Sequence, residues 1–505
     1  MPRITVGKAN EDGGFLVAGF DTETEFLGEP CRWANKLSRL LLPASAAGGQ
    51  VRLTVGVAPE QGAQRLEVTS SGRSVGQFDL RAGWQECALD LPAASHGAEG
   101  VEIVLQCSNP HDNGWKPQCI ALGKVEFAGE PASETAPEHH RAKILWGDPH
   151  IHSNYSLCGR PDNGSAEENY ARAREHAKLD FAVVTDHAMH MSAADWDACV
   201  QAAEAANEEG TFITFPAFEW TSEMYGHRNV YYRRPGGGMC DFWEKPKPRD
   251  LWQFLEDQPD SLVVPHHPIR AEHMLDWAFS DDSREPLVEI YSGWGSSEYW
   301  GDPLQERDKA VPGCSVRDAL ARGLRVGFVA GGDAHWYRPG AAGLTAVLAE
   351  ELTREALWTA LGERRCYATS GARIELDFRL NGHPMGSVLS GNQYSFRSFY
   401  PLHITAAVKG TAPIAKIEVI SNGAVVHTHT QTCASDLWVR GFEGEFTTTF
   451  SHVIEAPGAY CPFEGDAART NQLADVSRYY YLRVEQVDRH AAWSSPIYLR
   501  FEPTE

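Results

Sequence analysis

The sequence predicts an α/β domain, a β/α barrel, between two β-sandwich domains. Three observations predict this arrangement. Short strands with alternating apolar residues fill residues 1–128 and 372–505, apolar strands alternate with helical patterns over residues 143–371, and a polar segment with two prolines occupies residues 129–142. A chain of 505 residues is too long for one hydrophobic core, so several domains are expected.

The first 128 residues are expected to form an antiparallel, jelly-roll-like β-sandwich. Apolar and polar residues alternate over residues 51–57, 65–69, 101–106 and 120–127. A period of two is typical of strands with one buried and one exposed face, and turn residues separate these runs. The polar residues 129–142 are then expected to be a linker.

Residues 143–371 are expected to form the barrel. Ser165 with Glu168 makes a capping-box signature ahead of a helix that reaches residue 178. Ser192 with Asp195 resembles it ahead of a second helix that reaches residue 209. Further helices are expected at residues 249–258, 315–322 and 353–365. Short apolar strands lie between these helices, and a β/α barrel is the natural closure of such an alternation.

After residue 371 the helical patterns stop. Strands of a second sandwich are expected at residues 374–380, 402–408, 417–421, 425–430, 446–450 and 479–484. The two sandwiches offer no chemistry of their own, so packing, substrate shielding or oligomer formation is favoured for them over glycan binding.

Charge and composition exclude several functions. The formal net charge of −23 repels polyanions, so no nucleic-acid partner is expected. There is no signal-peptide core near the N-terminus and no apolar stretch of membrane-spanning length, so no membrane association is expected. The 11 cysteines are dispersed, without a C-x-x-C pair, which is typical of reduced thiols in a cytoplasmic protein.

Residues of metal-ligand type follow successive apolar runs of the expected barrel. They are His150 and His152 after residues 144–146, His187 after 181–185, Glu219 after 212–217, His266 and His267 after 262–265, and Asp333 and His335 after 326–330. The carboxyl ends of parallel barrel strands converge on one rim, where barrel enzymes place their chemistry. The sequence therefore predicts a multinuclear metal site.

Individually these signals are weak. The pair His150 and His152 occurs by chance in many proteins, and Asp186 could cap a turn as well as orient the imidazole of His187 from behind. Glu219 is a lone carboxylate between bulky aromatic residues, and burying it requires a metal or strong hydrogen bonds. A glycine before His227 suggests a close backbone approach, which is consistent with a ligand.

The joint pattern resembles the PHP (polymerase and histidinol phosphatase) superfamily, in the branch whose barrel carries accessory domains. The similar segments are residues 146–156, 179–188, 263–268, 288–293, 331–335 and 364–371. The resemblance covers roughly residues 143–385 and implies a distorted, PHP-type β/α barrel.

The resemblance also implies three adjacent metal sites. The first would be held by His150, His152, Glu219 and Asp333. Glu219 would bridge to a second site completed by His227 and His267, and His187 and His335 would hold a third. Many relatives have a His or Asp shortly after the H-x-H, where this chain reads Ser156-Leu157-Cys158-Gly159, so either the thiol of Cys158 is a softer ligand that favours zinc or the third site is weak or empty. Two or three divalent ions, zinc, manganese or iron, are therefore expected.

The predicted activity is hydrolysis of a small organic phosphate ester by a metal-bridging hydroxide. Arg270 and Arg338 are candidate phosphate clamps, and His266 is a candidate substrate contact. If the third site is empty, His187 or His335 could protonate the leaving group, with Asp186 as the orienting carboxylate. Two alternatives stay open: hydrolysis of carbamate or carboxylic esters at the same metals, and a non-catalytic protein that binds a glycan or another protein. Homo-oligomer formation is also left open.

Overall fold

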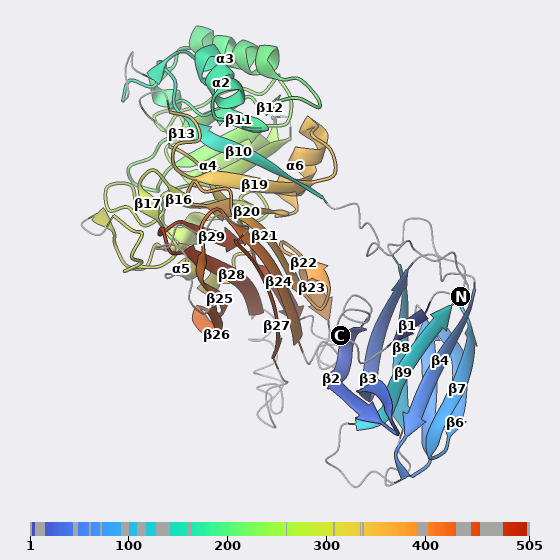
Figure 1. Ribbon diagram of the computed structural model, residues 1–505. Helices are drawn as coiled ribbons and strands as arrows, with labels where there is room; N and C mark the ends of the chain where they lie inside the picture. Colours follow the sequence, from blue (N-terminus) through green and yellow to red (C-terminus); the bar gives the residue numbers. More distant parts are fainter. Residues whose placement is uncertain are drawn as a thin grey trace, which may run out of the picture.

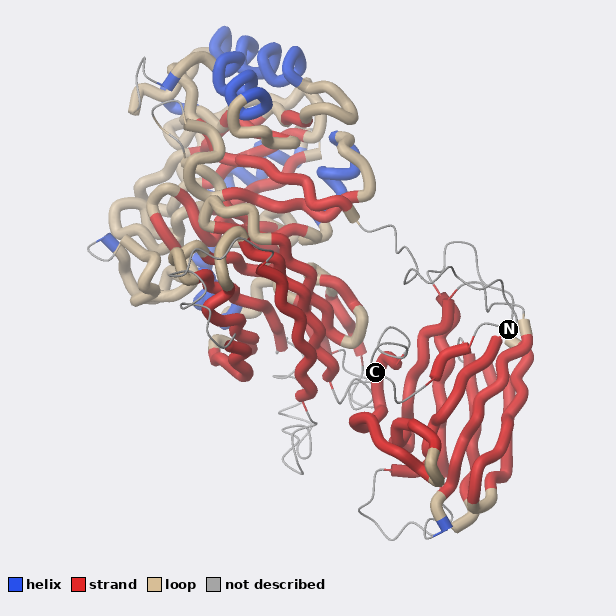
Figure 2. The backbone as a smooth tube through the Cα atoms, in the orientation of Figure 1, coloured by secondary structure: helices blue, strands red, loops and turns tan. Residues whose placement is uncertain are grey.

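The computed structural model is rich in β-strands and has few helices (Figures 1 and 2). It describes residues 3–5, 16–43, 49–59, 62–70, 73–91, 100–108, 118–127, 142–158, 163–258, 260–306, 309–333, 335, 338–391, 402–430, 446–454 and 478–501. None of the helices in these ranges has both the length and the apolar character needed to cross a bilayer.

The N-terminal part is an antiparallel nine-stranded sheet in the order β6-β5-β8-β3-β9-β4-β7, with β1 on β9 and β2 on β3. Its strands are β1 (Arg3–Thr5), β2 (Leu16–Phe26), β3 (Glu29–Pro43), β4 (Gln50–Val57), β5 (Gln64–Ser70), β6 (Arg73–Leu80), β7 (Gly83–Asp90), β8 (Gly100–Ser108) and β9 (Gln118–Phe127). The end strands β6 and β7 contact each other, so the sheet folds over on itself. The alternating residues Leu53, Val55 and Val57 are fully buried between the layers, as their period of two predicts.

All the α-helices among the described residues lie in the central part of the chain. Its elements are β10 (Lys143–Ile151), α2 (Ala166–Glu175), β11 (Phe181–Val184), α3 (Ala193–Ala206), β12 (Ile213–Thr214), β13 (Ala217–Trp220), β14 (Arg228–Tyr232), α4 (Pro248–Glu256), β15 (Ser261–Pro265), β16 (Leu287–Ser292), β17 (Gly295–Ser296), α5 (Val316–Ala321), β18 (Gly327–Ala330), β19 (Leu344–Ala349), α6 (Arg354–Gly362) and β20 (Cys366–Thr369). Both predicted capping boxes are present. Ser165 and Ser192 each accept a hydrogen bond from the N3 backbone N–H, and the N3 carboxylate accepts one from the N-cap backbone N–H.

The predicted parallel barrel is not confirmed. Strands β10, β11 and β12 run parallel, and so do β16 and β18, but β13, β14 and β15 form an antiparallel sheet and β10 pairs antiparallel with β19. The connection between Trp220 and Arg228 is too short for the crossover helix that a parallel neighbour requires, so β14 returns antiparallel. The strands nevertheless succeed one another in space, because β11 contacts β13, β15 contacts β16, and β18 contacts β19 and β20.

The C-terminal strands continue the central sheet. They are β21 (Glu375–Leu380), β22 (His383–Pro384), β23 (Val388–Gly391), β24 (Leu402–Gly410), β25 (Ile414–Ser421), β26 (Ala424–Thr430), β27 (Phe446–Ile454), β28 (Arg478–Gln486), β29 (Ala491–Ser494) and β30 (Ile497–Phe501). An 11-stranded sheet runs β12-β11-β10-β19-β20-β29-β28-β25-β26, with β30 beside β28, and a four-stranded sheet runs β22-β21-β24-β27. Segments on both sides of residue 371 thus share one sheet, and Trp146, Tyr367, Ile404 and Val484 share one core.

Candidate metal centre

The structure brings the sequence-predicted metal ligands together from strand ends that lie far apart in the chain. His150 lies near the end of β10 and His152 just after it, Glu219 lies in β13, His267 follows β15, and Asp333 follows β18. Their donor atoms lie within 4.8 Å of one another in four overlapping groups: His150, His152 and Glu219; His150, His266 and Asp333; His227, His266 and His267; and His152, Cys158, His187 and His335.

The first set of donors comprises His150, His152, Glu219 and Asp333. His150 Nε2 lies 3.7 Å from Glu219 Oε2 and 3.6 Å from Asp333 Oδ1, and His152 Nε2 lies 3.5 Å and 3.2 Å from the same two oxygens. Ligand bonds of about 2.0–2.1 Å in a tetrahedron place donors about 3.3–3.4 Å apart, which is the spacing found here. All four side chains are buried.

Glu219 lies between the first set and a second one. While its Oε2 faces His150 and His152, its Oε1 lies 2.8 Å from His227 Nδ1 and 3.6 Å from His266 Nε2. His267 completes this second set, and its Nε2 lies 3.9 Å from Asp333 Oδ2 of the first. A carboxylate with one oxygen toward each set is placed to bridge two cations.

Most of these imidazoles are held from behind, so that Nε2 faces the centre. His150 Nδ1 lies 2.8 Å from Glu289 Oε2, and His152 Nδ1 lies 3.0 Å from Ser156 Oγ. In the same way, His187 Nδ1 lies 2.7 Å from Thr221 Oγ1, and His335 Nδ1 lies 2.9 Å from the carbonyl oxygen of Asp333. Outer partners of this kind fix the tautomer and ring orientation of metal-binding histidines.

The donor set fits divalent cations. Several buried atoms of the donor residues have no hydrogen-bond partner among the described residues: His150 Nε2, Glu219 Oε2, His227 Nε2, His266 Nδ1 and Nε2, and His267 Nδ1. Leaving so many buried polar atoms unpaired in one place is costly unless a ligand satisfies them. Cations coordinated by these nitrogens and oxygens would remove that cost.

The electrostatics of the site also suit cations. Burial alone would raise the pKa of Glu219, but His187, His266 and His227 around it lower that pKa well below its usual range. Burial lowers the pKa of His152 to about 3, and burial together with the nearby His150 lowers that of His266 to about 4. At neutral pH Glu219 is therefore ionised and these two imidazoles are neutral, which are the protonation states that metal ligands need. The carboxylates have the opposite effect on two other ligands: despite burial, Asp333 and Glu289 hold the pKa of His150 well above its usual value, and Glu219 does the same for His187, so a cation would displace a proton from each of these imidazoles.

The backbone around the ligands is tightly constrained. A Cβ at Gly331 would lie 2.5 Å from His150 Cβ and 2.8 Å from Glu289 Oε2, so only glycine allows β18 to approach β10 there. His267 and Asp333 have φ values of 32° and 45°, in a region that residues with a side chain seldom adopt. Unfavourable backbone at two ligands is typical of a functional site, since surrounding structure must hold it.

The remaining sequence-predicted residues lie in different surroundings. Asp186 accepts hydrogen bonds from the backbone and hydroxyl groups of Ser153 and Ser156, so its link to an imidazole passes through Ser156 to His152. His266, expected to contact substrate, is fully buried among the second set of donors. Arg338 is exposed and follows Asp333 and His335 in the chain.

Arg270 lies close to the centre, in contact with Trp294. Its guanidinium carbon lies 3.7 Å from the centroid of the Trp294 ring, and it also pairs with Glu272 at 3.2 Å. The indole Nε1 of Trp294 in turn donates a 2.5 Å hydrogen bond to Asp333 Oδ2. Trp294 therefore links the cation of Arg270 to a predicted metal ligand.

Sequence reasoning missed several residues of the site. Glu289, in β16, gave the same signal as Glu219, a lone carboxylate between apolar neighbours, but was not singled out. His273, whose ring centroid lies 4.3 Å from that of His227, follows no apolar run and gave no signal. The contact between Trp294 and Asp333 spans 39 residues and could not be read from local pattern.

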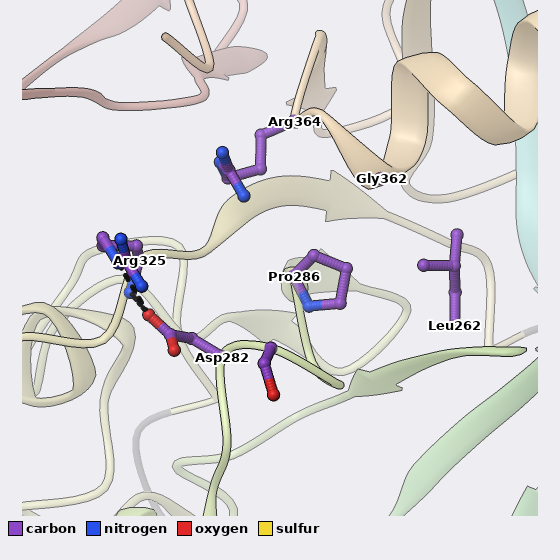
Figure 3. Close-up of a pocket in the computed structure, with 7 residues that line it drawn as sticks. Leu262, Asp282, Pro286, Arg325, Gly362 and Arg364 are labelled. Atoms are coloured by element: carbon purple, nitrogen blue, oxygen red, sulfur yellow. Dashed lines mark hydrogen bonds and ion pairs between the residues drawn. The ribbon is translucent and has the colours of Figure 1, made fainter. Parts of the chain in front are cut away.

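A separate cavity of about 380 Å³ lies at the opposite ends of the same strands (Figure 3). It is lined by Leu262, Asp282, Ser283, Pro286, Arg325, Gly362 and Arg364. Pro286 and Arg325 lie just before β16 and β18, whereas Asp333 lies just after β18. Within the cavity, Arg325 Nε donates a 3.0 Å hydrogen bond to Asp282 (Figure 3). The cavity and the donor sets are therefore distinct features.

Comparisons with known proteins cover much of this part of the chain. A family model described as "Protein of unknown function (DUF3604)" matches residues 190–309 and 297–382, a region that holds Glu219, His227, His267 and Asp333. An uncharacterised protein of Chlamydia pneumoniae is 31% identical over 382 residues, covering 70% of this chain and 57% of the relative. One of Chlamydia trachomatis is 36% identical over 325 residues, covering 58% and 47%. The chain thus spans about half the length of the curated relatives it matches.

Solved structures give distant matches. A two-domain protein of Bacteroides vulgatus, described as containing a predicted PHP-like metal-dependent phosphoesterase, is 13% identical, with a TM-score of 0.36 over 72% of this chain and 96% of that one. A family 35 carbohydrate-binding module from an environmental isolate is 13% identical, with a TM-score of 0.19 over 26% of this chain and 94% of the module.

Proposed function

We propose that this protein is a metal-dependent hydrolase of the PHP type, acting on a small phosphate ester. The observation that carries the proposal is Glu219, a fully buried carboxylate that presents one oxygen to His150 and His152 and the other to His227. A buried anion with imidazoles on both sides is costly in an empty site and is explained by two cations that share it.

Each proposed position has its own ligands. His150, His152, Glu219 and Asp333 would hold the first ion, and Glu219, His227, His266 and His267 would hold the second. We assign His266 to the ligands rather than to the substrate because it is fully buried and both its ring nitrogens lack a partner among the described residues. Divalent ions held there supply Lewis-acid activation of water and of a phosphoryl oxygen.

The chain's own residues would then bind and orient the ester. The guanidinium carbon of Arg270 lies 3.7 Å from the centroid of the Trp294 ring, and its Nε and Nη2 both donate to Glu272 Oε2; phosphate oxygens would replace that carboxylate as the bidentate acceptor. Its pairing with Glu272, which is exposed, is weak enough to be exchanged for an anionic substrate. Arg338 is a second, more peripheral cation for the same anion. Trp294 fixes Asp333 by its hydrogen bond.

The test combines metal content with a substrate panel. The purified protein should carry at least two transition ions per chain and should hydrolyse p-nitrophenyl phosphate or bis-p-nitrophenyl phosphate faster than an aryl carbamate. His152→Ala and Asp333→Ala should each abolish turnover with an unchanged far-UV circular dichroism spectrum, while His176→Ala, at an exposed histidine of α2's C-terminal end, should leave it unchanged.

Other results would replace the proposal. Turnover of only the carbamate would reassign the enzyme to carbamate or carboxylic esters at the same metals. Less than one ion per chain would instead favour a non-catalytic binding protein. Near-full activity in His152→Ala or Asp333→Ala would show that the ligand assignment is wrong.

A further inference from the structure

We propose that Cys158, His187 and His335 form a third, thiolate-containing position in the same centre, and that it selects zinc over manganese. The inference rests on the proposed function, because this position adjoins the two argued above. It adds the identity of a ligand and a metal preference, neither of which follows from the first two positions.

The distances fit such a position. Cys158 Sγ lies 3.1 Å from His335 Nε2, and the ligand atoms of His152, Cys158, His187 and His335 all lie within 4.8 Å of one another. With zinc bonds of about 2.3 Å to sulfur and 2.0–2.1 Å to nitrogen, tetrahedral donors lie about 3.5 Å apart. Cys158 and His335 therefore need only a small adjustment to share one ion.

The two imidazoles are oriented for Cys158 by their outer contacts. His335 Nδ1 is held by the carbonyl oxygen of Asp333 at 2.9 Å, and His187 Nδ1 by Thr221 Oγ1 at 2.7 Å. Each contact leaves Nε2 as the nitrogen that can coordinate an ion. His152 Nε2 instead lies 3.2 Å from Asp333 Oδ1, so it belongs to the first position. Three protein ligands remain, which leaves a coordination place open, as in catalytic zinc sites.

The turn that carries Cys158 is anchored. Asp186 accepts hydrogen bonds from the backbone and hydroxyl groups of Ser153 and Ser156, and the Leu157 backbone N–H donates to His190 Nδ1 at 3.2 Å. These contacts hold the turn so that the Cys158 thiol lies beside the imidazoles of His187 and His335. Cys158 is also the exposed cysteine among the described ones, whereas Cys314 is half-buried and the others are buried.

The ligand chemistry gives the metal preference. Imidazole and carboxylate ligands at the first two positions accept zinc, manganese or iron, whereas a thiolate favours the softer zinc. We therefore expect that protein exposed to equal concentrations of manganese and zinc holds zinc at the third position, even where manganese has replaced zinc at the first two positions.

Cobalt substitution tests the thiolate directly. Co²⁺-loaded protein should show a near-ultraviolet sulfur-to-cobalt charge-transfer band. Cys158→Ser should lose the band and about one cobalt per chain. Cys158→His should lose the band but keep the cobalt, because an imidazole can replace the thiolate. The matched control Cys314→Ser should keep both.

The outcomes separate this inference from the function on which it rests. Bound cobalt without a charge-transfer band in the natural protein, or a band that survives in Cys158→Ser, would overturn the thiolate position and leave the other two positions standing. Absence of any bound cobalt would overturn the metal centre as a whole. Equal retention of manganese and zinc by the natural protein would overturn the proposed preference.

Discussion

Glu289 illustrates that the site depends on residues that hold the metal ligands from behind. Its Oε2 lies 2.8 Å from His150 Nδ1, and both side chains are buried. The carboxylate accepts the N–H of that imidazole, fixes the ring so that Nε2 faces Glu219 and Asp333, and makes it a stronger ligand. At the scale of single residues, orientation and protonation therefore decide whether the donors can bind.

Glu289→Gln should weaken metal binding. The amide keeps the size of the side chain but removes the negative charge that supports the His150 imidazole, so affinity at the first position should fall about 10–100-fold. Isothermal titration of apo protein with Zn²⁺ measures this, with the exposed Glu350→Gln as the control. An unchanged affinity in Glu289→Gln would remove Glu289 from the description of the site.

Gly331→Ala should damage the same position by crowding. The added Cβ would lie 2.5 Å from His150 Cβ, which side-chain rotation cannot move, so the backbones of β18 and β10 must separate. Overpacking of this kind costs about 1–3 kcal/mol in unfolding free energy, and it should also reduce bound metal. Urea unfolding and metal analysis together measure the effect. Gly362→Ala, where an added Cβ meets nothing within 4 Å, is the control and should leave bound metal unchanged.

At the scale of elements, the segment after β16 joins two parts of the site. Trp294 contacts Asp333 through its N–H and Arg270 through its ring face. One side chain thus supports a proposed metal ligand and a proposed phosphate clamp at the same time. The two contacts can be separated by substitution, because one needs the indole nitrogen and the other only an aromatic face.

Trp294→Phe and Trp294→Leu should therefore differ. Trp294→Phe loses the hydrogen bond to Asp333 and should lower metal affinity, while the ring under Arg270 persists. Trp294→Leu also loses the cation–π contact, worth about 0.5–2 kcal/mol, so KM for a phosphate ester should rise a further few-fold to about 30-fold. Steady-state kinetics at saturating metal measures the difference. Equal KM values in the two variants would show that Arg270 does not depend on the ring.

The sequence predicted some of these elements better than others, for physical reasons. Helix starts were predicted because a cap such as Ser192 acts on its own first turn. Most of the ligands were predicted because they follow an apolar run, whereas His227 and Cys158 were predicted from the family resemblance. Strand direction was not, since a short strand such as β14, buried along its whole length, packs equally well in either direction. Contacts such as that of Glu289 with His150, 139 residues apart, depend on the assembled fold.

At the scale of the whole molecule, a buried charge cluster joins the central part to the C-terminal strands. Glu298 is fully buried and accepts hydrogen bonds from Arg317 of α5, Arg483 and Tyr481 of β28, and Trp493 of β29, at 2.6–3.1 Å. It lies four residues after Trp294, in the segment that reaches the metal centre. Strands β28 and β29 of the C-terminal part thus hold that segment through Glu298.

Glu298→Gln should destabilise the protein more than any loss of a surface ion pair. The substitution leaves the guanidinium of Arg317, whose side chain is only 18% exposed, facing a neutral amide, while Arg483 keeps its ion pair with Glu418. Removing one partner from a buried cluster costs about 3–5 kcal/mol, because the remaining charges stay out of water. Glu306→Gln breaks the exposed pair with Lys309 and should cost at most about 1 kcal/mol. Urea unfolding compares the unfolding free energies of the two variants. If the C-terminal sheet positions Trp294, metal affinity should fall in Glu298→Gln and stay unchanged in Glu306→Gln. Equal unfolding free energies would show that the charge cluster adds nothing to the strand pairing and apolar packing that join the two parts of the chain.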